Sequence, residues 1–374
     1  MHEPISASLR RRRRLAPFAL VALALLAVIG LQHWQLNEYA ITPGDATPVA
    51  PLVKVHGVAT NPHHDRILLT DVYLSPVSAF QWLSLHFQRH VEFVAPDQLL
   101  EPGVPADELD AQGFLQMSDS KQAAEVAAFR ALGWKVPAVS AGAVINAVIA
   151  PSPARAAHLH VGDEIVGVNA TPIRNACGLV RALHDLAPAT TVQLAVRPVT
   201  ISRAGVLTWG RVVRRSLTTA AAPKGMLAPS CAAISGPGRS YVGVSLEDGL
   251  RYQLPATISI NTANIGGPSA GLAMTLALID RLSHGSLTGG HVVAATGTMS
   301  PNGVVGDVGG VAEKTVAVQR AGAQYFLVPQ VEVATARANA SPGLTVLGVS
   351  SLAQALKDLR VLGGAAPAAL TPPS

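Results

Sequence analysis

The chain has 374 residues, of which 49% are hydrophobic and 14% are charged, so it can build two or three domains with their own cores. The formal net charge is +5, but arginines 10–14 supply five of the 28 basic residues and the rest of the chain is close to neutral. Aromatic residues make up 4%, and no basic stripe interleaves with them. The composition therefore gives no support to nucleic-acid binding.

The N-terminal segment combines Arg10–Arg14 with an uncharged, mostly apolar run from Leu15 to Leu31. This run is near the lower length for crossing a bilayer, about 17 to 25 residues. The positive-inside bias places the arginines in the cytoplasm and everything after Asn37 outside. We therefore predict a cytoplasmic tail and transmembrane anchor over residues 1–38. A cleaved signal peptide is the alternative, but no small-x-small cleavage site follows the run and Gln32–Gln35 resembles an interfacial belt.

The segments between the motifs give coarser predictions. Short apolar alternations broken by Pro and Gly predict a β-rich region within residues 39–132, which ends in an Ala-rich amphipathic helix over 118–132. Residues 201–236 are expected to be a connecting β segment, and 241–246 the first strand of a domain spanning 237–362. The Ala- and Pro-rich tail 363–374 is expected to be disordered.

The cysteines and histidines do not indicate a metal site, because no Cys/His cluster has zinc-ligand spacing. Cys177 and Cys231 fall in the part expected outside the cytoplasm, where a disulfide can form. Sequence alone does not place them within bonding distance, so two free buried thiols are the alternative.

The run Gly266–Gly271 places Ser269 directly before an apolar stretch, 270–280, that is typical of a buried helix. The first N–H groups of a helix have no intrahelical partner, and its N-terminal end is positive. Main-chain donors at the turn formed by Gly267, Pro268, Ser269 and Ala270 are thus candidates for holding an oxyanion. A serine here is equally an ordinary helix cap.

Lys314 lies in a predicted helix, 311–321, which Gly322 closes. Val311, Lys314, Val318 and Ala321 share one face, so the amine is expected among apolar neighbours. Burial lowers the pKa of a lysine, and a neutral amine can act as the general base for a serine nucleophile. The alternative is a lysine that extends its amine to solvent.

Residues from about 241 to 360 resemble the proteolytic domain of the Lon family. The likeness rests on Gly267–Gly271, Ala295–Thr298, Gly303–Gly306, Gly309–Lys314, Ala321–Ala323 and Tyr325–Pro329, which occur in the family's order and spacing. It implies that Ser269 is the nucleophile, Lys314 the base, and Thr296 a hydrogen-bond partner of the lysine. The chain has no G-x-x-x-x-G-K-[ST] loop, so no nucleotide-driven unfolding and no cofactor are expected from it.

Residues 142–198, within a predicted domain over 133–200, resemble a PDZ domain of the bacterial protease-associated kind. The likeness rests on Ser152–Leu159, Gly162–Asn169 and the helix 178–183. PDZ domains capture extended peptides by strand addition. The groove is expected between strand 143–147 and helix 178–183, with Gly142, Val144, Ile145, Leu179 and Leu183 as contact residues. The alternative is that this module packs on the protease and binds nothing.

The whole order resembles the bacterial PDZ-containing Lon-like membrane proteases. This implies a mixed α/β (α+β) fold and an ATP-independent serine endopeptidase that cleaves unfolded or flexible polypeptides. It also implies a bacterial inner-membrane location with the bulk of the chain extracytoplasmic and, by analogy, a homo-oligomeric ring. Two alternatives stay open: an inactive PDZ scaffold on a Lon-like fold, and a serine site that uses His284 or His291 as its base.

Overall fold

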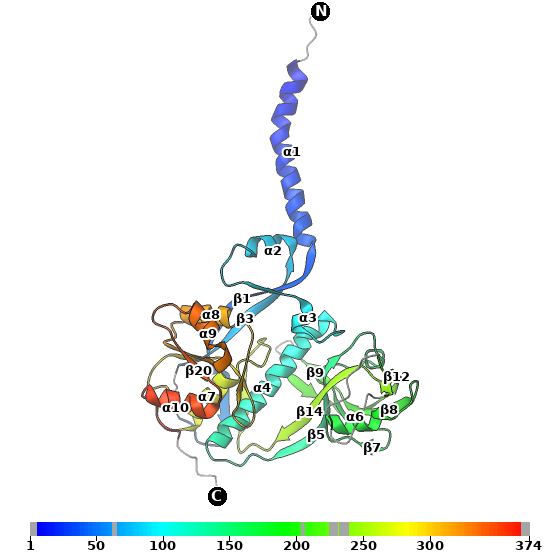
Figure 1. Cartoon of the computed structure of the whole chain (residues 1–374), viewed down its shortest axis with the longest axis vertical. Coiled ribbons are helices and arrows are strands. Elements are labelled where there is room, and N and C mark those ends of the chain that lie inside the picture. Colours follow the sequence, from blue (N-terminus) through cyan, green and yellow to red (C-terminus); the bar gives the residue numbers. More distant parts are fainter. Residues whose placement is uncertain (1–5, 62–65, 203–205, 224–230, 232–238, 368–374) are drawn as a thin grey trace, which may run out of the picture.

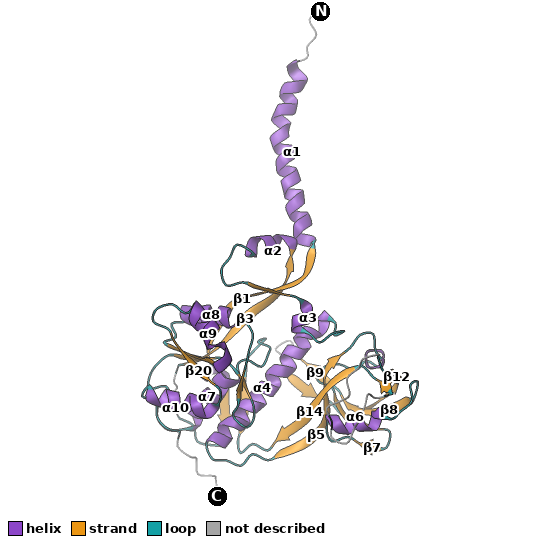
Figure 2. Ribbon diagram, in the orientation of Figure 1, coloured by secondary structure: helices purple, strands orange, loops and turns teal. Residues whose placement is uncertain are grey.

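The structure is a computed structural model that describes residues 6–61, 66–202, 206–223, 231 and 239–367, with side chains from residue 20 onward (Figure 1). Two compact bodies lie side by side below a long N-terminal helix (Figure 1). Both bodies mix helices and strands (Figure 2), which confirms the predicted mixed α/β fold. The predicted disordered tail, 363–374, falls partly on residues 368–374, which lie outside the described residues.

The N-terminal helix α1 (Ser6–His33) projects away from both bodies (Figure 1). Its large apolar side chains between Leu20 and Ile29 are exposed. Within the part of the chain that the structure describes, no helix has the combination of length and apolar character that a membrane crossing requires.

The first body contains a six-stranded sheet in the order β20-β19-β16-β3-β1-β4. The strands are β1 (Gln35–Pro48), β3 (Ile67–Ser78), β4 (Glu92–Val94), β16 (Val293–Ala295), β19 (Tyr325–Pro329) and β20 (Thr345–Val349). The four strands from β20 to β3 are parallel, and β1 pairs antiparallel with both β3 and β4. Buried strands of this kind are apolar throughout, as Val293–Ala295 and Phe326–Val328 are.

Helices cover both faces of this sheet. They are α4 (Leu109–Ala131), α7 (Gly271–Leu282), α8 (Val311–Arg320), α9 (Val333–Asn339) and α10 (Leu352–Val361). α7 is buried at every position except Arg281, which confirms the predicted buried helix. α4 begins nine residues before the predicted start at 118, and it packs on α7 through Phe129 and its neighbours. Smaller elements complete the body: α2 (Ala79–Leu85), α3 (Pro96–Leu99), β2 (Val53–His56), β15 (Thr257–Ile260), β17 (Thr298–Met299), β18 (Val305–Gly306) and 3₁₀ turns at Ala50–Leu52, Ala106–Glu108 and Gln330–Glu332.

The second body is a sheet in the order β11-β8-β6-β5-β14, with a short strand β7 (Thr171–Pro172) beside β6. Its strands are β5 (Ala138–Val148), β6 (Glu164–Val168), β8 (Thr191–Arg197), β11 (Val213–Thr218) and β14 (Val244–Tyr252). Helices α5 (Pro153–Ala156) and α6 (Ala176–His184) pack on it around a core that includes Ile145 and Leu179. Two small ribbons, β9 (Val199–Ile201) with β10 (Leu207–Trp209) and β12 (Ala220–Ala221) with β13 (Ser240–Tyr241), lie at its margin.

The second body is an insertion within the first. Residues before 132 and after 257 build the first body, whereas residues 138–252 build the second. The structure differs here from the expectation that 241–246 begins the proteolytic domain, because β14 pairs antiparallel with β5 over its whole length. It also differs for residues 39–132, which give β1 and β3 to the large sheet instead of forming a separate β-rich region. A short apolar hairpin cannot bury its faces alone, so β3 joins β16.

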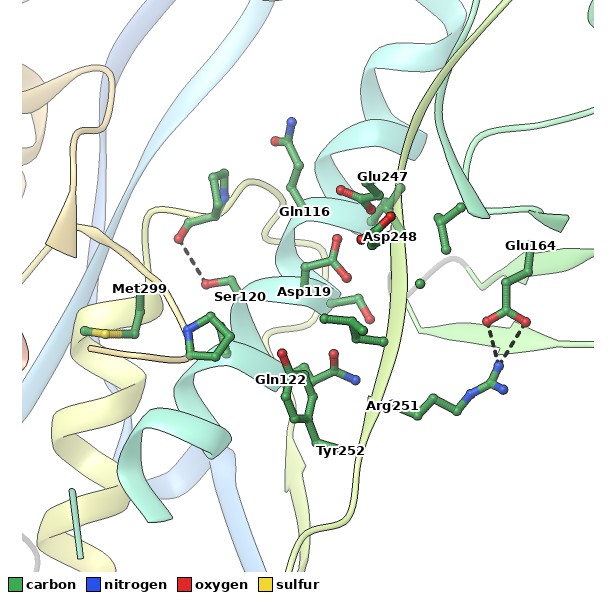
Figure 3. A pocket seen from close by; sticks show the side chains of 18 of the residues that line it. Gln116, Asp119, Ser120, Gln122, Glu164, Glu247, Asp248, Arg251, Tyr252 and Met299 are labelled. Atoms are coloured by element: carbon green, nitrogen blue, oxygen red, sulfur yellow. Dashed lines mark hydrogen bonds and ion pairs between the residues drawn. The ribbon is translucent and has the colours of Figure 1, made fainter. Parts of the chain in front are cut away.

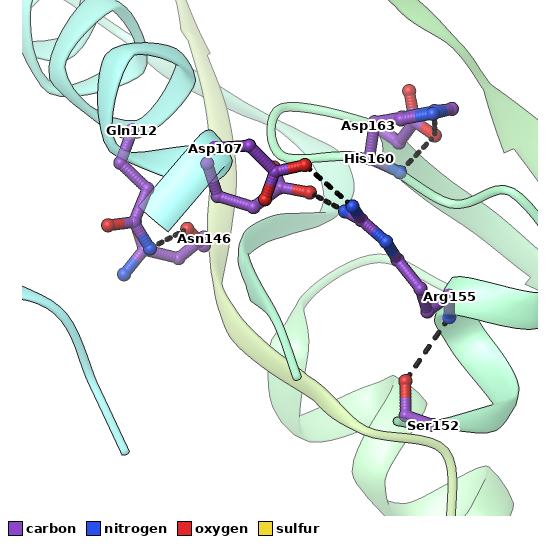
Figure 4. A network of polar contacts seen from close by, with 8 residues as sticks. Asp107, Gln112, Asn146, Ser152, Arg155, His160 and Asp163 are labelled. Atoms are coloured by element: carbon purple, nitrogen blue, oxygen red, sulfur yellow. Dashed lines mark hydrogen bonds and ion pairs between the residues drawn. The ribbon is translucent and has the colours of Figure 1, made fainter. Parts of the chain in front are cut away.

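Polar contacts tie the two bodies together near the start of α4 (Figure 4). Arg155 of α5 binds Asp107 at 2.7 Å and also pairs with Glu108. Gln112 of α4 donates to the carbonyl of Asn146 on β5 at 3.0 Å. The inserted body is therefore held against α4 by side chains as well as by the chain itself.

Cys177 and Cys231 form a disulfide, which decides between the two alternatives left open by the sequence. The bond joins the first turn of α6 to a chain segment 54 residues further on.

Candidate functional site

Ser269 lies in the turn that leads into α7, two residues before the helix begins at Gly271. Its side chain is half-buried, and its carbonyl accepts from the N–H of Gly297 at 2.9 Å. Gly267 has φ +84°, in the left-handed region that favours glycine. Within the described residues, the N–H groups of Ser269 and Ala270 have no hydrogen-bond acceptor. The turn therefore presents a hydroxyl next to two free main-chain donors at the positive end of a helix.

Lys314 lies in the first turn of α8 and is 2% exposed. The N-cap residue Gly310 has φ +66°, and a Cβ there would lie 2.9 Å from Val72. Glycine thus lets α8 approach β3 closely, which carries the lysine inward. Among the described residues the amine forms no salt bridge.

Burial lowers the pKa of Lys314 to about 8, and the more distant carboxylates of Glu332, Asp71 and Glu313 oppose part of that shift. Removal from water penalises the ammonium form, and no contacting anion compensates. With this lowered pKa, part of the Lys314 population carries a neutral amine near neutral pH. A general base must be in this neutral form.

Residues 266–270 are called the nucleophile turn after the role predicted for Ser269. Ser269 and Lys314 line one pocket of about 510 Å³, between this turn, α8 and the β1–β3 hairpin. We call it the dyad pocket; its other lining residues are Asp45, Thr47, Leu52, Asp71, Val72, Tyr73, Asn261, Thr262, Ala263, Asn264, Ile265 and Gly266. The two residues are 45 positions apart in sequence, and the fold brings them to the same cavity.

Thr296 follows β16 and is fully buried. Its hydroxyl donates to the carbonyl of Ser269 at 3.3 Å, whereas the resemblance implies the lysine as its partner. Thr296 and the N–H of Gly297 thus hold the same carbonyl of the turn.

The two histidines considered as alternative bases lie elsewhere. His284 follows the C-terminal end of α7, and a helix of 12 residues places it about 18 Å from the Ser269 end. His291 precedes β16 and contacts Gln324 and Tyr325, at the opposite end of that strand from Thr296. Neither is among the residues that line the dyad pocket.

The residues expected to contact a peptide in the PDZ groove lie in packed positions. Ile145, Leu179 and Leu183 belong to the core of the inserted body, and Val144 packs on the α4 side with Leu115. A Cβ on Gly142 would lie 2.7 Å from the carbonyl oxygen of Ile165, so this glycine permits strand packing.

The expected groove strand also has no free edge. β5 pairs with β6 on one side and with β14 on the other, so the edge of the sheet next to α6 is β14. Asp248 of this edge strand accepts from the N–H of Ala176 at the start of α6, at 2.9 Å. Strand addition at 143–147, as expected from the sequence, therefore does not fit the structure, because both edges of β5 are already paired.

Sequence reasoning missed the acidic side of the dyad pocket. Asp71 lies on β3, where its carboxylate accepts from the N–H of Asp45 at 2.7 Å. Asp45 in turn accepts from the hydroxyl of Tyr73 at 2.6 Å. The available signal was a carboxylate two residues after the apolar run 67–69, at the point where a buried strand emerges.

A second pocket, of about 420 Å³, lies between α4 and β14 and reaches the nucleophile turn at Pro268 (Figure 3). Asp119 of α4 and Glu247 of β14 point toward each other across it (Figure 3). Loss of solvent, together with the Glu247 carboxylate, raises the pKa of Asp119 above its usual range.

Comparison with known proteins matches two parts of the chain to families. Residues 261–359 match the Lon protease (S16) C-terminal proteolytic domain, and residues 130–197 match the PDZ domain. Over 97 residues the chain is 35% identical to Lon protease 1 of Herpetosiphon aurantiacus. That match covers 26% of this chain and only 12% of the relative.

Similar solved structures include the PDZ domain of the SdrC-like protein of Listeria monocytogenes, at 17% identity, covering 28% of this chain and 87% of that one, with a TM-score of 0.21. The second domain of a listeria protein is similar at 18% identity, covering 28% and 82%, with a TM-score of 0.20. The region matched to the Lon proteolytic domain contains Ser269, Thr296 and Lys314. By these matches, the chain contains one region similar to the Lon C-terminal proteolytic domain and another similar to a PDZ domain, and it spans about an eighth of the length of the curated relative.

Proposed function

We propose that the protein is an ATP-independent serine endopeptidase that uses Ser269 as nucleophile and Lys314 as general base. The observation that carries the proposal is the dyad pocket, in which a half-buried serine beside two free amides shares a cavity with a buried, unpaired lysine. A lysine of lowered pKa can remove the serine proton without a histidine.

The reaction proceeds in two halves. The neutral amine of Lys314 takes the hydroxyl proton of Ser269, and Oγ attacks the scissile carbonyl carbon. The N–H groups of Ser269 and Ala270 stabilise the resulting oxyanion. The ammonium of Lys314 then gives its proton to the leaving amine, which leaves an acyl-enzyme. Water adds to this ester with Lys314 again as base, which releases the acid and restores the serine.

The chain lacks the phosphate-cradling loop of an ATPase, so we propose substrates that need no unfolding, namely flexible segments or unfolded chains. For peptide recognition we propose the free edge of β14 beside α6, because an edge strand can pair with an extended peptide. This edge also supports the second candidate function, a peptide-binding scaffold without activity.

We further propose that the N-terminal segment, whose side chains are described only from residue 20 onward, anchors the protein in a bacterial inner membrane, with both bodies extracytoplasmic. In support, the described part of α1 exposes apolar side chains, and the adjoining helix α2 exposes Leu83. The arginine block supports the orientation. Mass spectrometry of the mature protein tests for cleavage, and alkaline carbonate extraction tests for anchoring. Release of uncleaved protein by carbonate contradicts the anchor.

The peptidase proposal is tested with purified full-length protein and an unfolded protein substrate. We expect cleavage by wild type and by the His284→Ala and His291→Ala variants, and none by Ser269→Ala or Lys314→Ala. A fluorophosphonate should label Ser269 in wild type and in both histidine variants, but should not label Ser269→Ala or Lys314→Ala. Cleavage that survives Lys314→Ala contradicts the lysine mechanism, and a folded wild type that neither cleaves nor labels favours the scaffold.

A further inference from the structure

Helix α4 contacts the nucleophile turn directly, although it lies outside the region matched to the Lon proteolytic domain. Ser120 is 4% exposed, and its hydroxyl donates to the carbonyl of Pro268 at 3.0 Å (Figure 3). Two helical turns earlier, the carbonyl of Gly113 accepts from the N–H of Gly267 at 2.7 Å. Residues seven apart share a helix face, so one face of α4 holds two consecutive residues of the turn.

The packing between α4 and the turn leaves no spare room. A Cβ on Gly266 would lie 3.2 Å from the carbonyl carbon of Gly113. A Cβ on Gly271 would lie 3.0 Å from Oγ of Ser120 and 2.8 Å from Met299. The glycines on both sides of Ser269 therefore permit the close approach of α4. The hydrogen bond of Ser120 is thus made within a packed contact.

The bonded carbonyl belongs to the same planar peptide group as the N–H of Ser269. The carbonyl and the N–H of one trans peptide point in opposite directions, and the group rotates as a unit. Fixing the carbonyl of Pro268 against α4 therefore fixes the direction of the Ser269 N–H. Rotation of this group would turn an oxyanion donor away from the dyad pocket.

We propose that Ser120 is a positioning residue that orients the Pro268–Ser269 peptide group and with it one oxyanion donor. The inference rests on the proposed peptidase function. Ser120 does not touch substrate; it acts through the peptide group. The oxyanion exists only in the transition state and the intermediate. Loss of the Ser120 hydroxyl is therefore expected to lower kcat and to leave KM nearly unchanged.

The test uses full-length protein and steady-state cleavage of a fluorogenic peptide. Ser120→Ala is expected to lower kcat by about 10- to 100-fold, somewhat less than outright removal of an oxyanion donor, with KM within about twofold. A peptide boronate, whose tetrahedral adduct places an oxygen at the same donors, should bind more weakly by a similar factor.

Two further variants separate positioning from packing. Ser118, on the same helix, lines the α4–β14 pocket, and Ser118→Ala should match wild type. Ser120→Cys fills the contact with a slightly larger side chain that is only a weak donor, so it should show the low kcat of Ser120→Ala even if the alanine variant unfolds.

If wild type is active, the inference alone is overturned by either of two results. One is a Ser120→Cys variant that keeps the full kcat, and the other is a Ser118→Ala variant that loses as much kcat as Ser120→Ala. A loss expressed only in KM does the same. A folded wild type that neither cleaves peptide nor labels at Ser269 overturns the proposed function and the inference together.

Discussion

The buried lysine makes a quantitative prediction about pH. With a pKa of about 8, roughly one Lys314 in ten is neutral at pH 7, whereas at the ordinary value of 10.5 only about three in ten thousand would be. Burial therefore raises the population of the active base about 300-fold. In the proposed mechanism only the neutral amine accepts the serine proton, so kcat/KM should rise about tenfold per pH unit below about pH 7.5 and level off above about pH 8.

Replacement of a neighbouring carboxylate should shift the rise of kcat/KM with pH to lower pH. The carboxylate of Asp71 favours the ammonium form of Lys314 and so keeps its pKa higher. Asp71→Asn removes the charge and keeps the oxygen that accepts from the N–H of Asp45. The midpoint should therefore shift to lower pH. Asp45→Asn is the matched control, because Asp45 is not among the carboxylates that act on Lys314.

The assay is the initial rate of fluorogenic peptide cleavage from pH 5.5 to 9.5 at low substrate concentration, which reports groups of the free enzyme. The protein's thermal unfolding is followed at each pH to show that it stays folded. The reasoning would be refuted if kcat/KM rose with a midpoint near pH 6.5 that disappears in a histidine variant. It would also be refuted if Asp71→Asn left the dependence of kcat/KM on pH unchanged.

Three other predictions concern stability. Replacing Cys177 and Cys231 by serine opens a loop spanning 54 residues, and chain entropy predicts a loss of about 4 kcal/mol in urea unfolding of the inserted body. The raised pKa of Asp119 predicts that stability falls as pH rises between about 4 and about 8, and Asp119→Asn should flatten the dependence of Tm on pH. Gly271→Ala should cost about 1 to 3 kcal/mol and most of the activity by overpacking, whereas Gly309→Ala meets open space and should unfold like wild type.

The surroundings of Ser269 and Lys314 could be predicted from the sequence because local patterns encode them, whereas the roles of these residues stay predictions. An apolar run after Gly266–Gly271 indicates a helix, and the structure has α7 from Gly271. The apolar face around Lys314 indicates burial, and the side chain is 2% exposed. Helix starts and helix faces depend on neighbours within a few residues, so they are visible without the rest of the chain.

Strand partners were not visible in the same way. The alternation of apolar and polar residues in 244–252 fits any half-buried strand. It does not show whether β14 joins the large sheet or the sheet of the inserted body. The PDZ contact residues failed for this reason, since β5 has a free edge only if β14 lies elsewhere. Likewise, nothing local in 67–78 shows that β3 pairs with β16 more than 200 residues later.

The insertion of the PDZ body has a consequence that neither domain shows alone. The chain enters this body from α4, which holds the nucleophile turn through Ser120. It leaves through β14 and β15, and the next residues, Asn261–Gly266, line the dyad pocket up to Ser269. Both covalent connections of the inserted body thus lead to the turn that contains Ser269. A displacement of β14 against α4 would act on the turn from both sides, whereas a domain attached at one end would have a single connection.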